Sequence, residues 1–432
     1  MTVTTREFTA GVRATSAVLV GVLLVVGGPS AAQEPAPPAE PNKPPDLCSR
    51  DSLTGRWLGL GKTLAEQGVR VGLGLTQVYQ LNLEGGLATH RHAGRYTGSY
   101  DLEVELDLER LLRLPGGTFF VLAEGSWSDG LNASSVGGLL GLNDDAGGDR
   151  SIDVTEMWHE QRMLDGRLIF RIGKIDLTSG FECRRCPAAF DGSAYANDEV
   201  TQFLSSALVN NPTIPFPDNG LGAMVHVEPV AGLYVAAGVA DAQADGRETG
   251  LGTAFHEEDQ FLGILEVGLA PGLLGRPGAY RVGLWYDPQP KDRFSGGTQR
   301  DDVGFYASCD QLVYKENADV KDIQGLGLFG RFGCADSDVN EMAGFWSVGG
   351  QYRGPIPGRD DDVLALGVAQ GLLSRDAEWG RASQETVMEM YYSAVVCGWL
   401  TVSGHVQYVN NPGGTNDVDD AVVVGLRAQV KF

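Results

Sequence analysis

Acidic residues recur at every second position between Ser99 and Glu109, and this spacing decides where their charges point. The odd positions after Ser99 are all acidic, and the even positions from Tyr100 to Leu108 are all apolar. Successive side chains of a β-strand point to opposite faces, whereas a helix would scatter these acids around its axis. The segment is therefore a strand with one charged face. That face needs water, because a charge that points into lipid costs several kcal/mol.

Other charged and aromatic residues have the same alternating placement. Glu156, Trp158 and Glu160 share one face of a single segment, and Arg171 lies on the polar face of the next. Carboxylates and guanidinium groups are strong acceptors and donors, and an aromatic ring adds apolar surface, so together they hold a polyhydroxyl solute weakly as it passes. The residues expected to line such a passage are Glu103, Glu105, Glu124, Trp158, Glu160, Arg171, Arg331 and Arg427. Within this set we expect the glutamates to oppose the arginines; the alternative is that each is only a solvated wall residue.

Two further patterns point weakly to covalent or metal chemistry. Ser403 and His405 share a face of one strand, a minimal pair for nucleophilic hydrolysis, but the chain has no Gly-x-Ser-x-Gly elbow. Cys183 and Cys186 have the spacing of a zinc or redox pair, but no second such pair and no partnering histidine accompany them. We therefore expect no catalytic residue, metal site or cofactor, and a hydrolase remains only an alternative.

Alternating segments that would position these residues extend along the whole body of the chain. The segments are 70–82, 99–109, 118–127, 151–163, 167–175, 220–228, 232–240, 260–269, 278–286, 303–315, 324–333, 343–353, 362–371, 386–396, 399–409 and 421–432. An even number of strands is typical of a single-chain bacterial barrel. We therefore expect an all-β fold, a 16-stranded antiparallel transmembrane β-barrel. A soluble secreted β-sandwich is the alternative, and it would bury more of the aromatic residues that lie near the strand ends.

The last strand shows the two faces most clearly. Its even positions, from Val422 to Phe432, are all apolar, and its odd positions include Arg427 and Lys431. In an outer-membrane barrel the apolar face meets lipid and the polar face meets water in the lumen. A final strand that ends on Phe432 is characteristic of such barrels, and through this residue we expect the barrel-assembly machinery to recognise the chain.

The amino-terminal residues have the pattern of an export signal. Two arginines precede the apolar stretch Ala17–Val26, and small residues follow it up to Ala32. This pattern predicts a secretory signal peptide over residues 1–32, and a short membrane anchor is the alternative.

The rest of the chain divides into three parts. Residues 33–47, rich in Pro and Ala, are expected to form an extended periplasmic linker. The segment 48–68 would form a periplasmic segment with a short helix, and 69–432 the barrel. The net charge of −23 argues against nucleic acid as a partner, because phosphates would be repelled.

The connections between strands supply an independent check. Short and long connections mostly alternate, as expected when short turns face the periplasm and long loops face outwards. The connection 176–219 is too long for a plain loop, so we expect it to fold into the lumen and narrow it; a cover over the mouth is the alternative.

Six cysteines in an exported protein are expected to form disulfides. The predicted pairs are Cys183–Cys186 within one loop, Cys48–Cys397 on the periplasmic side and Cys309–Cys334 on consecutive strands.

Several short segments together resemble one known family over roughly residues 53–432. They are Leu53–Trp57 with Leu64–Val69, Tyr100–Leu111 with Pro115–Phe120, Glu156–Gln161, Arg171–Asp176, Gly325–Gly333, Tyr352–Arg359 and Asn411–Gly414. In this order and spacing they resemble the carbohydrate-selective porin family of the OprB type. The resemblance implies a sixteen-stranded porin of the bacterial outer membrane, often a homotrimer, surrounded by lipid and admitting glucose-like sugars by passive diffusion. It also implies a short periplasmic helix near Arg56–Glu66. A non-conducting structural or adhesive surface barrel is the alternative.

Overall fold

The computed structural model of the chain describes residues 47–90, 93–182, 203–255, 258–272, 275–317, 319, 324–377 and 383–432. The predicted signal peptide and nearly all of the predicted linker lie outside the described residues. The same holds for both cysteines of the predicted Cys183–Cys186 pair.

Strands make up most of the described chain. The strands are β1 (Val69–Gly86), β2 (Gly94–Asp107), β3 (Gly117–Trp127), β4 (Arg150–Met163), β5 (Leu168–Ile175), β6 (Gly220–Val230), β7 (Leu233–Asp241), β8 (Phe261–Leu269), β9 (Gly278–Asp287), β10 (Lys291–Asp292), β11 (Thr298–Gln299), β12 (Asp302–Lys315), β13 (Gly325–Cys334), β14 (Met342–Arg353), β15 (Val363–Leu373), β16 (Gln384–Cys397), β17 (Leu400–Asn410) and β18 (Asp419–Lys431). The helical elements are short: η1 (Leu47–Ser49), α1 (Gly55–Leu58), α2 (Leu60–Glu66), α3 (Leu108–Leu112), η2 (Asn132–Val136), α4 (Ser206–Val209), η4 (Gly252–Ala254) and η6 (Pro412–Gly414).

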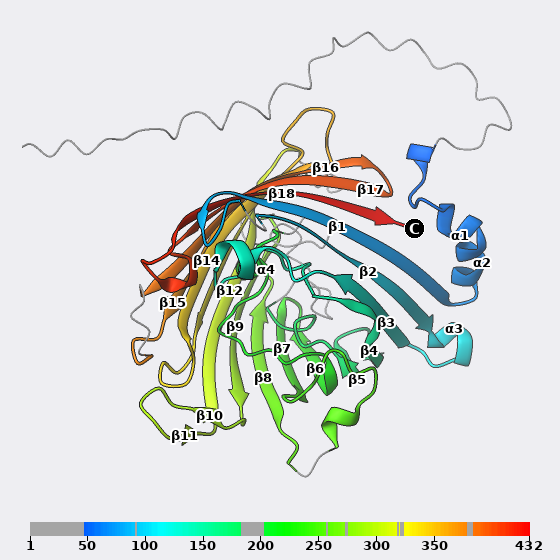
Figure 1. The fold of residues 1–432 in the computed structure, drawn as a ribbon. Helices are drawn as coiled ribbons and strands as arrows, with labels where there is room; N and C mark the ends of the chain where they lie inside the picture. The colour runs from blue at the N-terminus through cyan, green and yellow to red at the C-terminus, as the bar shows by residue number, and fades with distance from the viewer. Residues whose placement is uncertain are drawn as a thin grey trace, which may run out of the picture. The chain divides into compact units, whose positions relative to one another are not determined.

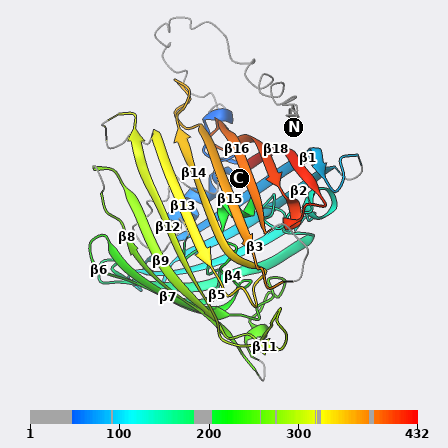
Figure 2. The ribbon, with the colours of Figure 1, turned by 90° about the vertical axis from the view of Figure 1, so that its left-hand side faces the viewer.

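Sixteen of these strands form one closed antiparallel barrel, which confirms the predicted fold (Figures 1 and 2). Each strand pairs with its neighbours in the chain, except that β9 pairs with β12 across the small β10–β11 hairpin. The last strand, β18, returns to pair with β1. A closed sheet has no free edge, so the backbone N–H and C=O groups of the wall bond to one another and need no partner from lipid.

The two faces of the wall have the character that the sequence predicts. On β18, Val423 and Arg427 are each 1% exposed, whereas Leu426 between them is 55% exposed. On β9, Arg281 is buried and its neighbour Val282 is exposed. Exposed apolar side chains therefore face lipid, and buried polar ones face the lumen. No helix in the described part of the chain has the length and apolar character needed to cross a bilayer.

Two local predictions differ from the structure. The strand predicted at 99–109 ends at Asp107, whose side chain accepts the N–H of Arg110 and so caps the start of α3. The helix predicted at Arg56–Glu66 is divided into α1 and α2 at Gly59. The φ angle of 92° at this residue lies in the left-handed region that glycine favours at the end of a helix.

Two long loops fold into the lumen. The β5–β6 loop packs Phe203 and Leu208, both fully buried, against inward-facing side chains of β13 to β18. The β3–β4 loop places Leu140 and Leu142 in the same cluster. The predicted inward course of 176–219 is thus confirmed for its described parts. The inward course of the β3–β4 loop was not predicted.

The segment before β1 is bonded to the end of the barrel where the first and last strands meet. The N–H of Leu53 donates to the carbonyl of Lys431 (2.8 Å). The indole N–H of Trp399, in the β16–β17 turn, donates to the carbonyl of Leu47 (2.9 Å). These bonds hold the segment at the rim, where β18 also ends (Figure 1).

Candidate pore constriction

One predicted pair of opposite charges meets on adjacent strands. Arg171 on β5 stands opposite Glu160 on β4, and its Nη2 atom donates to Glu160 Oε2 over 2.9 Å. The two side chains are only 9% and 3% exposed. Arg162 donates to the other oxygen of Glu160 (2.8 Å) but is itself 56% exposed. Glu160 is therefore held by two guanidinium groups, the buried one of Arg171 and the half-exposed one of Arg162.

Trp158 lies beside this pair with both faces of its indole in contact with neighbours. The guanidinium carbon of Arg171, on β5, is 3.9 Å from the ring centroid. Phe120, on β3, stacks on the ring with 4.8 Å between centroids. The indole N–H donates to Glu156 (2.7 Å). Trp158 therefore serves more as a support than as a free platform. Phe120 was not among the residues predicted from the sequence, although it lies on the same face of β3 as Glu124.

Three further predicted acids extend the charged wall over β2 and β3. Glu105 forms an ion pair with Arg70 on β1 (3.0 Å). Glu103 lies on the same face of β2, two residues away. In the strand register Glu124 stands between two more carboxylates, Asp101 on β2 and Asp153 on β4. Carboxylates placed side by side make this part of the lumen wall acidic.

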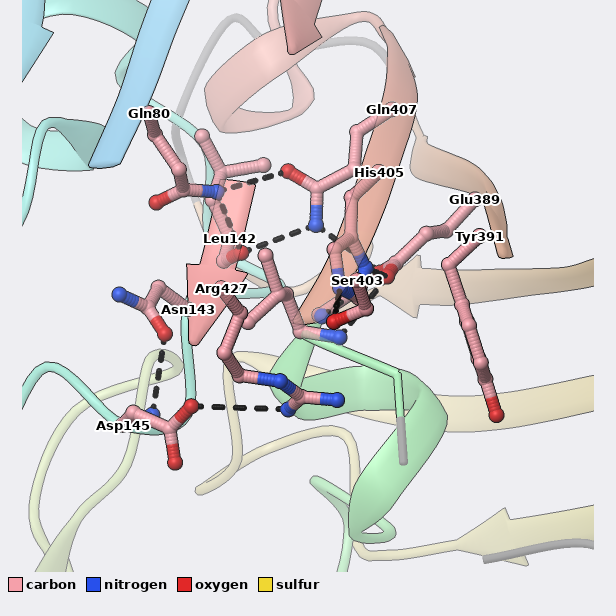
Figure 3. A network of polar contacts seen from close by, with 12 residues as sticks. Gln80, Leu142, Asn143, Asp145, Glu389, Tyr391, Ser403, His405, Gln407 and Arg427 are labelled. Atoms are coloured by element: carbon pink, nitrogen blue, oxygen red, sulfur yellow. Dashed lines mark hydrogen bonds and ion pairs between the residues drawn. The ribbon is translucent and has the colours of Figure 1, made fainter. Parts of the chain in front are cut away.

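The two remaining predicted arginines contact the in-folded loops. Arg331 on β13 donates from Nη1 to the carbonyl of Leu208 in α4 (2.6 Å). Arg427 on β18 lies 3.6 Å from the carboxylate of Asp145 in the β3–β4 loop (Figure 3). Both arginines are buried. They therefore help to fix the loops that narrow the lumen.

An open pocket of about 370 Å³ lies between the two in-folded loops. Apolar residues such as Leu139, Pro212 and Phe216 line it together with polar residues such as Thr178 and Asn210. A sugar needs apolar surface for its ring face and hydrogen-bonding groups for its hydroxyls. The pocket offers both.

Two glutamates on β16, which the sequence patterns did not single out, bind the main chain of both loops. Glu389 accepts the N–H groups of Leu204 and Ser205, each over 2.8 Å. Glu385 accepts N–H groups of the β3–β4 loop over 2.9 Å. Their spacing of four on one strand was a signal, because such residues share a face. It did not distinguish them from solvated wall acids.

Ser403 and His405 continue this network on β17 (Figure 3). His405 Nδ1 lies 2.8 Å from Glu389 Oε1, and His405 Nε2 lies 2.8 Å from Ser403 Oγ. The connectivity is that of a hydrolase triad. However, Ser403 is 2% exposed and His405 is 3% exposed, beneath the loop that Glu389 binds. A nucleophile must reach its substrate, so this geometry supports loop attachment rather than hydrolysis.

Burial changes the protonation of acids in the in-folded loops. Desolvation by the surrounding protein raises the pKa of Asp144 to about 7 although the residue itself is exposed, with a further contribution from the neighbouring charge of Asp145. Burial also raises the pKa of Glu182 to about 8. The pKa of Asp176 is raised for the same reason. Near neutral pH these loops therefore carry less negative charge than the sequence indicates.

The described cysteines require two corrections. Cys309 stands opposite Gly330 and Cys334 opposite Phe305, so the cysteines are offset by four residues along β12 and β13. That offset is about 13 Å, and a disulfide spans at most about 7 Å between Cα atoms. Both are free thiols, and the Cys309–Cys334 prediction is corrected accordingly.

The structure does not contain the predicted Cys48–Cys397 bridge either. Cys397 is a buried free thiol at the end of β16, whereas Cys48 is exposed on η1. Within the described ranges, no group of three or more His, Cys, Asp or Glu side chains is arranged to hold a metal ion.

Comparison with known proteins decides the family. The sequence profile of the carbohydrate-selective porin, OprB family, matches residues 91–432. The chain belongs to this family. The resemblance seen in the sequence is thus confirmed, and the chain is an outer-membrane porin through which carbohydrates pass.

Relatives of the porin cover nearly all of its length. Porin B of Pseudomonas aeruginosa is 26% identical over 426 residues, which cover 88% of this chain and 91% of that protein. The putative porin QuiX of Acinetobacter baylyi is 21% identical over 437 residues, which cover 90% and 95%. The high-pH structure of Pseudomonas putida OprB has a TM-score of 0.75 at 22% identity, and the match covers 89% of this chain and 99% of that one. The structural match supports the barrel fold.

Proposed function

We propose that the porin admits glucose-like sugars by passive diffusion through a water-filled, charge-lined route. The eight residues predicted from the sequence, from Glu103 to Arg427, would line that route or support it. The observation that carries the proposal is the nearly buried Glu160–Arg171 pair beside Trp158, on the lumen side of adjacent strands. Fixed charges of both signs offer sugar hydroxyls acceptors and donors in place of water.

Passage then depends on weak, replaceable contacts. Sugar hydroxyls exchange water for the carboxylates of β2 to β4, and ring faces meet apolar side chains such as Phe120 and Phe216. No bond is made or broken, so the solute leaves as readily as it enters. The carboxylate row of Asp101, Glu124 and Asp153 would favour cations among small ions.

Planar-bilayer recording of the purified porin tests this proposal. We expect an open single-channel conductance in salt that glucose and disaccharides reduce in a concentration-dependent way. A conducting channel that none of these sugars affects would contradict the proposed lining.

A plugged surface barrel is the second candidate, because two apolar clusters of loop and wall residues fill part of the lumen. It predicts a silent bilayer, and the function would then lie in the outer loops.

Export and assembly complete the proposal. We infer that residues 1–32 are removed by signal peptidase and that the assembly machinery reads Phe432. We also infer that the mature porin can form a homotrimer. Amino-terminal sequencing of the outer-membrane protein tests the first point, and we expect mature chains to begin at Gln33. Chemical crosslinking in intact outer membranes tests the last.

A further inference from the structure

The bonds that hold the in-folded loops converge on β16. Glu385 and Glu389 lie four residues apart on this strand, so their side chains leave the same face of the wall. Each is only 1% exposed. Glu389 uses one carboxylate oxygen for the N–H of Leu204 and the other for that of Ser205. Two neighbouring acids of one strand are therefore committed to loop contacts rather than to solvent.

Glu385 makes the equivalent contact with the other loop. Its Oε1 atom accepts the N–H groups of Leu139 and Leu140, each over 2.9 Å. Its Oε2 atom accepts the N–H of Gly413 from the β17–β18 loop (2.6 Å). One strand thus fixes three loops through their main chain.

A buried carboxylate is costly unless donors surround it, and Glu389 has four. Besides the two loop amides, His405 bonds to Oε1 and Gln407 donates to Oε2 (2.9 Å). Gln407 also donates to the carbonyl of Leu142 in the β3–β4 loop (2.9 Å), as Figure 3 shows. Both loops therefore share one hydrogen-bonded support on β16 and β17.

This support lies directly behind the pocket between the loops. Leu139 and Leu140, which Glu385 binds, line the pocket themselves. Ser206, the residue after the Ser205 amide that Glu389 binds, also lines it. Apolar packing alone tolerates sliding, whereas hydrogen bonds to particular amides fix the position of each loop along the wall. A shift of either loop would change the width of the pocket.

We propose that Glu385 and Glu389 are positioning residues that set the width of the channel and hence the largest sugar it admits. The proposal rests on the proposed function, because it assumes that sugars pass between the two loops. It assigns the size limit to the wall of the barrel rather than to the side chains of the loops.

The test compares Glu389→Gln with Ser393→Ala in the full-length porin. Gln keeps the volume of Glu389 but turns an amide NH₂ group toward one of the loop N–H donors. Ser393 is a matched control: it is buried on the same face of β16, four residues further along, and its hydroxyl has no hydrogen-bond partner among the residues that the structure describes. Liposome-swelling rates for a mono-, a di- and a trisaccharide are measured for each protein, and heat-dependent gel mobility checks that each barrel is folded.

We expect Glu389→Gln to raise the ratio of trisaccharide to monosaccharide uptake and the single-channel conductance, and Ser393→Ala to change neither. A folded Glu389→Gln barrel with an unchanged uptake ratio overturns the proposal. If the wild-type porin passes no sugar at all, it is the proposed function that fails.

Hydrogen exchange on the wild-type porin keeps the proposal testable if the variant does not fold. The amides of Leu139, Leu140, Leu204 and Ser205 should exchange at least roughly tenfold more slowly than amides of exposed outer loops, because they donate to buried carboxylates. Exchange at loop-like rates for these four amides would overturn the proposal.

Discussion

Arg171 and Glu160 face each other across β5 and β4, and the guanidinium group of Arg171 lies between the Glu160 carboxylate and the indole of Trp158. The arginine also donates to Ser179 Oγ at the start of the β5–β6 loop (3.1 Å). One side chain therefore balances a wall charge, covers an aromatic face and bonds to an in-folded loop.

Replacing this arginine should change the ion selectivity of the channel. In Arg171→Gln the Glu160 carboxylate keeps only the half-exposed Arg162, so the net negative charge of the lumen rises. We expect the reversal potential in a KCl gradient to shift toward cation preference, and the sugar block to weaken. Losing one partner of a buried pair also costs about 3–5 kcal/mol of stability, which should be visible as a lower unfolding temperature.

Arg162→Gln is the matched control, because it removes the exposed partner of the same carboxylate. Water screens the charge of Arg162, which is 56% exposed, so its loss should cost less stability than the loss of the buried Arg171. Its shift in reversal potential should be clearly smaller than that of Arg171→Gln. Equal shifts in reversal potential for the two variants would show that burial does not decide how much each arginine contributes to ion selectivity.

A charge on the outer face of the wall should destabilise the barrel. Leu426 lies near the middle of β18 and is 55% exposed on the apolar face. Leu426→Arg would place a guanidinium group in lipid at a cost of about 2–4 kcal/mol at the bilayer midplane. Urea unfolding of the porin in lipid vesicles measures this loss.

Leu426→Met serves as the control for the same position, because Met keeps the side chain apolar and of similar volume. The urea concentration at its unfolding midpoint should stay close to that of the wild type. An arginine variant as stable as Leu426→Met would place this face away from lipid.

The cysteines of β12 and β13 should be recovered as thiols. Their offset in the strand register leaves no geometry for a bond between them. Alkylation of the denatured porin without reductant, followed by peptide mass spectrometry, should find Cys309 and Cys334 modified. A peptide pair linked through these two residues would contradict the register.

The wall of the porin was predictable because alternation is a local signal. Along β18 the type of each residue indicates which face of the wall its side chain occupies. Arg427 lies on the lumen face and Leu426 on the lipid face, as their polarity requires. The same signal located all sixteen strands, although it ran past Asp107 because Leu108 and Glu109 of α3 happen to continue the alternation.

The constriction was only partly predictable, because it depends on contacts between distant segments. Glu160 and Arg171 are eleven residues apart and lie on consecutive strands, so their pairing followed from the strand order. Leu204 and Glu389 are 185 residues apart, and a main-chain N–H carries no side-chain signal. The leucines of the β3–β4 loop indicate that it packs against an apolar surface. The prediction of pore residues considered only charged and aromatic side chains and so did not include this signal.

Attachment of the β3–β4 loop should weaken as pH rises. Asp144 has a usual pKa of 3.8, and desolvation by the surrounding protein raises its pKa to about 7 in the docked loop, although the residue itself is exposed. Between these values the docked loop keeps a proton that a released loop has lost, so docking is strongest below pH 4. The loss grows up to about pH 7 and then levels off.

Hydrogen exchange of the β3–β4 loop amides at pH 5 and pH 8, corrected for intrinsic rates, measures this effect. We expect protection to fall at pH 8 in the wild type, and the fall to disappear in Asp144→Asn, which cannot ionise. Asp129→Asn is the control, because it removes another acid from the same loop. If protection is equal at the two pH values in the wild type, Asp144 is ionised in the docked loop, and a hydrogen-bond donor must compensate its charge there.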